Sequence, residues 1–261
     1  MKLETLSYKP SDGWSSKLPK TDSPQTLVLA FGAPSYDKKP EIFEALKKEY
    51  PKSKIIGCST SGEIFGTKVL DETISLAVVK FENTELKLAS ATISTSKESF
   101  DAGKKVANDL LADDLKAVFL LSDGLNVNGS ELIRGMNSVL SEKVIVTGGL
   151  AGDGDRFKKT WVLHDNKPQS GFISAISFYG SKIRVGHGSK GGWDIFGPSR
   201  KVTKSEGNVL HELDGKPALQ LYKEYLGERA NGLPATALLF PLALRASVKD
   251  EKYLVRTVLS V

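Results

Sequence analysis

Apolar runs of strand length alternate with amphipathic segments along most of this chain. Residues 26–31 and 117–121 are almost continuously apolar, which is typical of strands that are buried on both faces. Residues 40–50 and 130–140 carry apolar side chains at helical spacing, and Pro40 suits the first turn of a helix. The pattern therefore predicts a mixed α/β fold in which helices pack against a mixed β-sheet.

The same order of elements occurs twice. A strand, a helix, a strand, a glycine-rich acidic turn and further strands follow one another, and the series recurs about 90 residues later. Gly57 then corresponds to Gly148, and Gly62-Glu63 to Gly152-Asp153. We interpret the recurrence as an internal duplication into two related halves, with coincidence as the alternative because strand–helix–strand units are common. Strands are expected after the two turns at residues 74–81, 85–93, 160–164, 171–179 and 183–187.

Both ends of the chain depart from this pattern. Residues 1–25 are polar and contain three prolines, which predicts an irregular lead-in with one short strand near residues 3–8. The last residues form an apolar, strand-like run, which is more typical of a fragment than of a complete domain. Beyond Gly197 we expect strands at residues 200–203, 208–213, 237–244 and 253–261, and a helix at residues 217–226.

Composition narrows the functional classes. The 261 residues are 40% apolar and 26% charged, which is the balance of an ordinary globular protein. The net charge of +5 is modest and the basic residues lie among acids, so no nucleic-acid partner is expected. A single cysteine, Cys58, excludes an intramolecular disulfide and a multi-cysteine zinc site, and favours a cytoplasmic location. No apolar run approaches the ~20 residues of a membrane span.

The first turn, Cys58-Ser-Thr-Ser-Gly-Glu63, follows a predicted strand. Ser59, Thr60 and Ser61 supply hydroxyls and Glu63 a carboxylate, so the turn suits an amine at the carboxylate or an anion at its N–H groups. A tight connection between strands explains the same residues equally well. A nucleophilic Cys58 lacks a histidine at a known spacing, and a buried structural thiol is the stronger interpretation.

The second turn, Gly148-Gly-Leu-Ala-Gly-Asp153, adds Gly149, Gly152 and Asp153 to the candidate ligand-binding residues. It lacks the Gly-Lys-Ser/Thr of a Walker loop, and strands rather than a helix are expected after it, which argues against the Rossmann pattern. Its acids disfavour a phosphate and are too few for a calcium loop, so no metal site is predicted. We expect Glu63 and Asp153 to face one cleft between the halves and to hold an ammonium group there.

The remaining candidates are one tryptophan and three histidines. Trp193 follows a glycine-rich segment and is expected to close one wall of a pocket, with simple packing as the alternative. His164, His187 and His211 lack metal-site spacing, but a haem needs only one axial histidine, so haem stays an alternative cofactor with His187 as its ligand. No catalytic constellation is found, and we predict that the chain is not an enzyme.

Together these segments resemble a FIST domain. The resemblance lies in Ile56-Gly-Cys-Ser-Thr-Ser-Gly-Glu63 and in Gly148-Gly-Leu-Ala-Gly-Asp153, followed in the family's order by Gly191-Gly-Trp193 and Glu212-Leu-Asp-Gly215. It covers residues 26–216 as the amino-terminal FIST module. Residues 217–261 resemble only the start of the carboxy-terminal module.

The resemblance implies a sensory domain that binds a small ligand, with amino acids among the candidates, and that signals to a partner protein. Bacterial members often occur beside histidine kinases, chemoreceptor domains or cyclic-dinucleotide enzymes, and these are the partner classes expected for a bacterial protein. Some members bind haem and respond to nitric oxide, which is the alternative function. A scaffold without a ligand is the remaining hypothesis.

Overall fold

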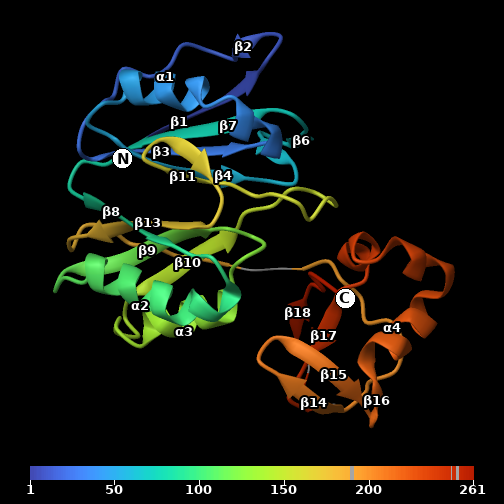
Figure 1. Ribbon diagram of the computed structural model, residues 1–261. Coiled ribbons are helices and arrows are strands. Elements are labelled where there is room, and N and C mark those ends of the chain that lie inside the picture. Colours follow the sequence, from blue (N-terminus) through green and yellow to red (C-terminus); the bar gives the residue numbers. More distant parts are fainter. Residues whose placement is uncertain (189–190, 248, 251–252) are drawn as a thin grey trace. The chain divides into compact units, whose positions relative to one another are not determined.

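The chain forms two compact units, Met1–His187 and Gly188–Val261 (Figure 1). The computed structural model describes residues 1–188, 191–247, 249–250 and 253–261. Ser189 and Lys190, in the glycine-rich segment before Trp193, lie outside the described residues.

The first unit contains a sheet of seven strands. These are β1 (Lys2–Lys9), β2 (Gly13–Trp14), β3 (Thr26–Gly32), β4 (Lys54–Ser59), β7 (Ile74–Lys80), β11 (Val162–His164) and β12 (Lys167–Gln169). Their order is β12-β11-β4-β3-β7-β1-β2. The central pair, β3 and β4, is parallel, whereas β7 runs antiparallel to both β3 and β1. The predicted lead-in therefore contributes a full strand, β1, to this sheet.

A second sheet in the same unit repeats part of this topology. Its strands are β8 (Glu85–Thr92), β9 (Leu115–Ser122), β10 (Ile145–Leu150) and β13 (Phe172–Tyr179), in the order β10-β9-β13-β8. The pair β9 and β10 is parallel, and β13 runs antiparallel to β9 and β8. Order and directions match those of β4-β3-β7-β1. The match supports the predicted duplication, which stays a hypothesis about origin.

The two sheets pack face to face, and helices cover their outer faces (Figure 1). Apolar side chains from both sheets, such as Cys58 and Ile176, form the core between them. The helices are α1 (Glu41–Glu49) on the first sheet, and α2 (Ser99–Leu110) and α3 (Gly129–Asn137) on the second. The first unit is therefore an α/β/β/α sandwich, and the predicted mixed α/β fold class is confirmed.

Gly57 and Gly148 occupy equivalent positions in the two parallel strand pairs. Gly57 pairs with Ala30, and a Cβ atom at Gly57 would lie 2.1 Å from the Ala30 carbonyl oxygen. Gly148 pairs with Leu120, and a Cβ atom there would lie 1.8 Å from the Leu120 carbonyl oxygen. Glycine therefore allows the paired backbones to approach closely just before each turn.

Some local predictions were wrong. Residues 183–187 form no strand, because only Ile183 packs into the core between the sheets and the residues after it are largely exposed. Helix α2 was not predicted, although its buried residues, which include Ala102, Gly103 and Val106, recur at helical spacing. Residues 237–244 do not form one strand, since a 3-10 helix, η4 (Ala235–Leu239), occupies their first part.

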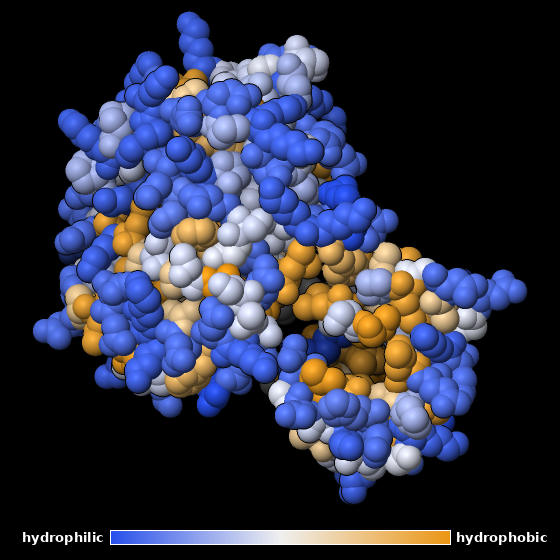
Figure 2. All heavy atoms as spheres, in the orientation of Figure 1, coloured by the Kyte–Doolittle hydropathy of each residue, from blue (hydrophilic) through white to orange (hydrophobic). Residues whose placement is uncertain are grey.

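The second unit has a small core. Its elements are β14 (Val202–Glu206), β15 (Val209–Leu213), β16 (Lys216–Pro217), α4 (Ala218–Leu226), β17 (Leu242–Leu244) and β18 (Leu254–Arg256). Among its described residues, only Ala218, Leu221 and Ala237 are buried apolar side chains. Hydrophobic residues accordingly gather on its surface (Figure 2). In the part of the chain that the structure describes, no helix has the length and apolar character needed to cross a membrane.

Candidate functional site

Both glycine-rich turns begin at the carboxyl end of a parallel strand pair. One residue beyond β4, the Thr60 N–H donates a hydrogen bond to the Gly32 carbonyl oxygen (3.0 Å). One residue beyond β10, the Ala151 N–H donates to the Ser122 carbonyl oxygen (2.8 Å). Each turn thus continues the backbone hydrogen bonding of its own parallel strand pair by one more bond. Ligands of α/β proteins bind preferentially at such carboxyl ends.

The two turns are in direct contact. The Gly152 N–H donates to the Ser59 carbonyl oxygen (2.9 Å), and the Gly154 N–H donates to the Ser61 hydroxyl (3.0 Å). A Cβ atom at Gly152 would lie 2.5 Å from that hydroxyl oxygen, so any larger residue there would force the Ser61 side chain to move. The structure therefore brings Ser59, Ser61 and Gly152 together, while their role in ligand binding stays a prediction.

Glu63 is buried beside the first turn. It begins a small hairpin of β5 (Glu63–Phe65) and β6 (Lys68–Leu70), and its side chain is 1% exposed. The Thr60 hydroxyl donates to Oε1 (2.8 Å), and the Thr73 N–H and hydroxyl donate to Oε2 (3.1 and 2.9 Å). Burial raises the pKa of Glu63, and these three hydrogen bonds oppose that effect. Among the described residues Glu63 has no cationic partner.

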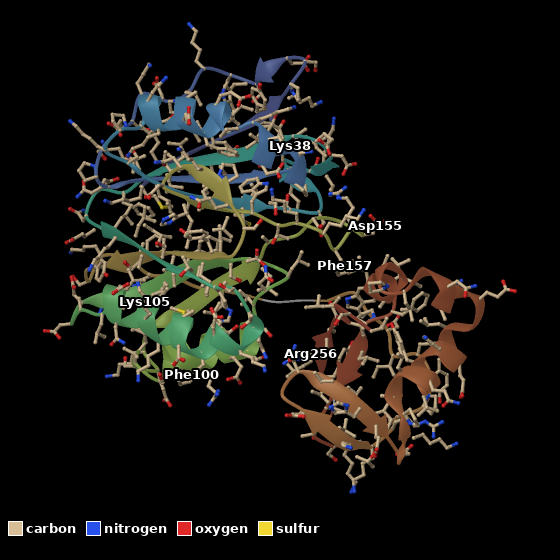
Figure 3. All side chains as sticks on the ribbon, viewed as in Figure 1. Lys38, Phe100, Lys105, Asp155, Phe157 and Arg256 are labelled. Carbon is tan, nitrogen blue, oxygen red and sulfur yellow. The ribbon has the colours of Figure 1, made fainter. Side chains whose placement is uncertain are left out.

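Asp153 is buried in the second turn and closes its own loop. Its Oδ2 accepts hydrogen bonds from the N–H groups of Lys158 (2.7 Å) and Lys159 (3.0 Å). Asp155 and Phe157 lie on the loop between these partners (Figure 3), and Asp155 is exposed. The two aspartates therefore differ in role, since only Asp153 is held inside the fold.

A third buried carboxylate, Asp123, was not predicted as a site residue. Its Oδ1 accepts hydrogen bonds from the N–H groups of Leu125 and Asn126 (both 2.8 Å), and its Oδ2 accepts one from Gly171 (2.9 Å). Asp123 directly follows β9, as the residues of the first turn follow β4. Its position after an apolar strand was the available signal, but the sequence Asp123-Gly124 indicated only a turn.

Glu63, Asp123 and Asp153 are the buried charged side chains of the described residues, and all three are acidic. Buried charges in proteins are usually paired with an opposite charge, yet the donors here are neutral N–H and hydroxyl groups. No group of three potential metal ligands occurs in the described ranges. The three carboxylates are therefore held by neutral donors, and none of them forms an ion pair with a described residue.

Two further candidates are not held in this contact. A Cβ atom at Gly149 would meet nothing within 4 Å, so the backbone of the second turn is open at this residue. Trp193 belongs to the second unit and is 42% exposed. Its expected position in a pocket wall stays a prediction.

Cys58 is buried between the sheets. Burial raises the pKa of its thiol to about 12, so the reactive thiolate is a very minor species at neutral pH. The thiol is therefore a structural side chain in this conformation, as the sequence indicates.

The histidines lie in surroundings that do not fit a haem pocket. His187 and His211 are exposed, and His164 stacks on Phe172 with 4.3 Å between ring centroids, beside a polar groove. Haem ligands normally sit in an enclosed, apolar pocket. Haem stays an alternative cofactor for this chain.

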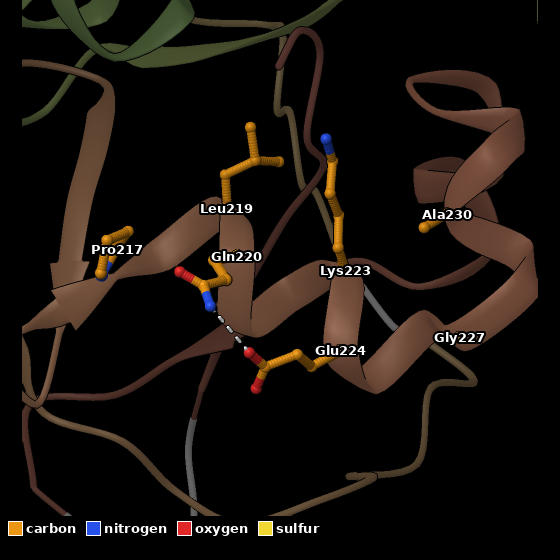
Figure 4. Close-up of a pocket in the computed structure, with 7 residues that line it drawn as sticks. All are labelled: Pro217, Leu219, Gln220, Lys223, Glu224, Gly227 and Ala230. Carbon is orange, nitrogen blue, oxygen red and sulfur yellow. Dashed lines mark hydrogen bonds between the residues drawn. The ribbon is translucent and has the colours of Figure 1, made fainter.

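A hollow of about 710 Å³ on the second unit contains none of the predicted site residues (Figure 4). It lies along α4 and the 3-10 helix η3 (Gly227–Gly232), where the Gln220 amide donates to the Glu224 carboxylate (3.2 Å). The hollow is wide open, and its lining gives no specific ligand chemistry.

Comparison with known proteins places this site in a family. The FIST N domain model matches residues 26–216, which include both turns. An uncharacterized protein of Methanocaldococcus jannaschii is 28% identical over 207 residues, covering 74% of this chain and 39% of the relative. The chain thus spans well under half of that relative's length. Because the family model covers most of the sequence, the chain belongs to the FIST N domain family, whose domains are classed as sensory and signal-transducing.

Proposed function

We propose that this FIST N domain senses a small polar metabolite, with an amino acid as the first candidate, at the contact between its two turns. The observation that supports this most directly is the hydrogen bond from Gly152 to Ser59, which joins the turn of one sheet to the turn of the other. A ligand bound at this contact would act on both sheets at once.

The chemistry of the contact suits an amino acid at both ends. Glu63 and Asp153 are carboxylates with neutral donors, and an ammonium group would supply the missing positive charge. The empty space beside Gly149, near the end of β10, leaves room for the ligand's carboxylate, and the exposed hydroxyl of Ser61 can donate a hydrogen bond to it. The second turn would thus contact both the ammonium group and the carboxylate of the ligand.

Binding at Glu63 requires a rearrangement of the turn. Both of its oxygens already accept hydrogen bonds from Thr60 and Thr73, and the side chain is inaccessible. A ligand that takes over these acceptors must favour a second conformation of the turns, which is what a sensor needs. A signalling protein would read that change; histidine kinases, chemoreceptors and cyclic-dinucleotide enzymes are the partner classes suggested by the family resemblance.

A thermal-shift screen of the twenty amino acids, followed by calorimetric titration of each hit, tests the proposal. Glu63→Gln and Asp153→Asn are expected to weaken binding at least about tenfold, the usual effect of losing one charge-assisted hydrogen bond. Gly149→Ala is expected to weaken binding without loss of stability, because the site around it is empty. Asp155→Asn, an exposed neighbour on the same loop, is the matched control and should bind normally.

Two results would contradict the proposal. One is a screen in which no amino acid shifts the unfolding temperature, which would favour the scaffold hypothesis. The other is an undiminished affinity for the amino acid in Glu63→Gln, Asp153→Asn and Gly149→Ala. A ligand whose binding depends on neither turn must bind elsewhere.

A further inference from the structure

A polar groove of about 370 Å³ lies in the first unit, away from the two turns. Strand β4 begins at this groove with Lys54 and ends at the first turn with Ser59. Lys47, Lys52 and Lys54 line the groove together with His164, Ser90 and Ser174, and we refer to it as the lysine groove. Its residues come from both sheets and from the end of α1.

The Asp22 carboxylate accepts hydrogen bonds from the N–H groups of Lys52 and Ser53 at the edge of the lysine groove, but it forms no ion pair with the lysine side chains. Among the described residues, none of the groove's three lysines forms an ion pair with a carboxylate within 4 Å. The Lys47 ammonium donates a hydrogen bond to the carbonyl oxygen of Pro51 (2.9 Å). Pro51 directly precedes Lys52 in the chain. The one acid of the lining, Asp165, has a side chain that is 89% exposed and lies 3.5 Å from the His164 Nε2.

The groove also contains a largely buried serine. Ser174 is 5% exposed and pairs across the strands with Ser90. It alternates along β13 with Ile173 and Ala175, which pack toward α2 and α3, so its side chain points toward the first sheet. Within the described ranges, neither serine hydroxyl donates to or accepts from another protein group. Among the described residues, the fully enclosed unpaired side-chain oxygen is that of Thr21 and not that of Ser174, so the Ser174 hydroxyl is open to the groove and available to a bound molecule.

One wall of the groove is rigid. Asp165 and Asn166 both have positive φ angles (48° and 61°), as in the tight two-residue turns of β-hairpins, and they join β11 to β12. The adjacent His164 ring is stacked on Phe172. The wall therefore keeps its shape before a ligand arrives.

We infer that the lysine groove binds a small molecule that carries a phosphate group. Lysines act as point charges that approach an oxyanion from several sides, and no guanidinium fork is present in the lining to favour a planar carboxylate. The serine hydroxyls add neutral donors to the phosphate oxygens. The volume suits a small metabolite and not a macromolecule.

Calorimetric titration at low ionic strength tests this inference with inorganic phosphate, glycerol 3-phosphate and succinate as probes. The unaltered protein should bind both phosphates saturably and succinate at least about tenfold more weakly. Tighter binding of glycerol 3-phosphate identifies a phosphate ester as the ligand class, and equal binding identifies free phosphate. Lys52→Gln combined with Lys54→Gln should weaken phosphate binding at least about tenfold, and Ser174→Ala about threefold.

Lys97→Gln combined with Lys204→Gln is the matched control, because it removes the same charge from exposed positions outside the groove. Equal weakening in the control, absence of saturable phosphate binding, or preference for succinate would overturn the inference. The amino-acid response at the turns should be unchanged in the groove variants, so the two proposals fail separately.

Discussion

A backbone hydrogen bond of 2.9 Å joins Gly152 to Ser59. Ser59 is the last residue of β4 in the first sheet, and Gly152 lies two residues beyond β10 in the second. The bond therefore links the carboxyl ends of two parallel strand pairs that belong to different sheets. Its geometry depends on residue 152 having no side chain, and this dependence can be measured.

Gly152→Ala is expected to lower the free energy of unfolding by about 1–3 kcal/mol, the usual cost of forcing an extra methyl group into a packed site. The new Cβ atom would lie 2.5 Å from the Ser61 hydroxyl oxygen. Ser61→Ala removes that oxygen and one hydrogen bond to Gly154, at a cost of about 1 kcal/mol. Denaturant unfolding of both single variants and of the double variant measures the coupling.

The double variant should be more stable than the sum of the two single effects predicts, because the clash disappears with the hydroxyl. Strict additivity would show that Gly152 and Ser61 do not touch in solution. The contact of the second turn with the Ser61 side chain would then be absent.

Gly148→Ala and Gly149→Ala form a matched pair of neighbours with opposite expected outcomes. At Gly148 the new Cβ atom would lie 1.8 Å from a backbone oxygen of Leu120, which no side-chain rotation relieves. We expect a loss of about 3 kcal/mol or more, at the severe end of overpacking, or failure to fold. At Gly149 nothing lies within 4 Å, and the change should stay within about 0.5 kcal/mol. Equal effects by chemical denaturation would contradict the pairing of Gly148 with Leu120 in the second sheet.

The fold class was predictable from sequence because the buried strands are continuous apolar runs and two helices are strongly amphipathic. The layer arrangement was not predictable, because both faces of β3 are apolar and nothing in the sequence shows that one faces α1 and the other the second sheet. Helix α2 was predictable from the helical spacing of its buried residues but was missed. Its buried face is built largely from small residues such as Gly103, which packs directly against the Leu132 backbone of α3.

The site was predictable in part. The turn residues and their glycines stood out because small residues and acids follow apolar strands at matching positions. The partners of Glu63 could not be inferred, since Thr73 lies ten residues further along the chain, directly before β7. Asp123 was missed because an Asp-Gly pair indicates a turn whether or not its carboxylate is buried.

Glu63 should make stability depend on pH. A raised pKa in the folded state means that the folded protein holds the proton more tightly than the unfolded chain does. The resulting stabilisation is fully present below the ordinary pKa of 4.5 and is lost as pH rises through the raised value. Glu63→Gln cannot titrate, so the stability of the unaltered protein relative to this variant should decline as the pH increases above 4.5.

Urea unfolding of both proteins at a series of pH values from about 4 to about 8 measures this difference. Glu44→Gln, at an exposed position of α1, is the control and should show no such decline. A difference between the unaltered protein and Glu63→Gln that grows with pH would mean that the hydrogen bonds from Thr60 and Thr73 outweigh burial.

Cys58 should be inert toward electrophiles in the folded protein. Its thiol is 3% exposed, and burial raises its pKa to about 12, whereas an unfolded cysteine has a pKa near about 8.5. Because only the thiolate reacts, labelling by iodoacetamide at about pH 7.5 should be at least about a thousandfold slower than in the protein unfolded by guanidinium, as followed by mass spectrometry. Rapid labelling of the native protein would place the thiolate at the surface of the first turn, beside Ser59. Cys58 would then again be a candidate nucleophile.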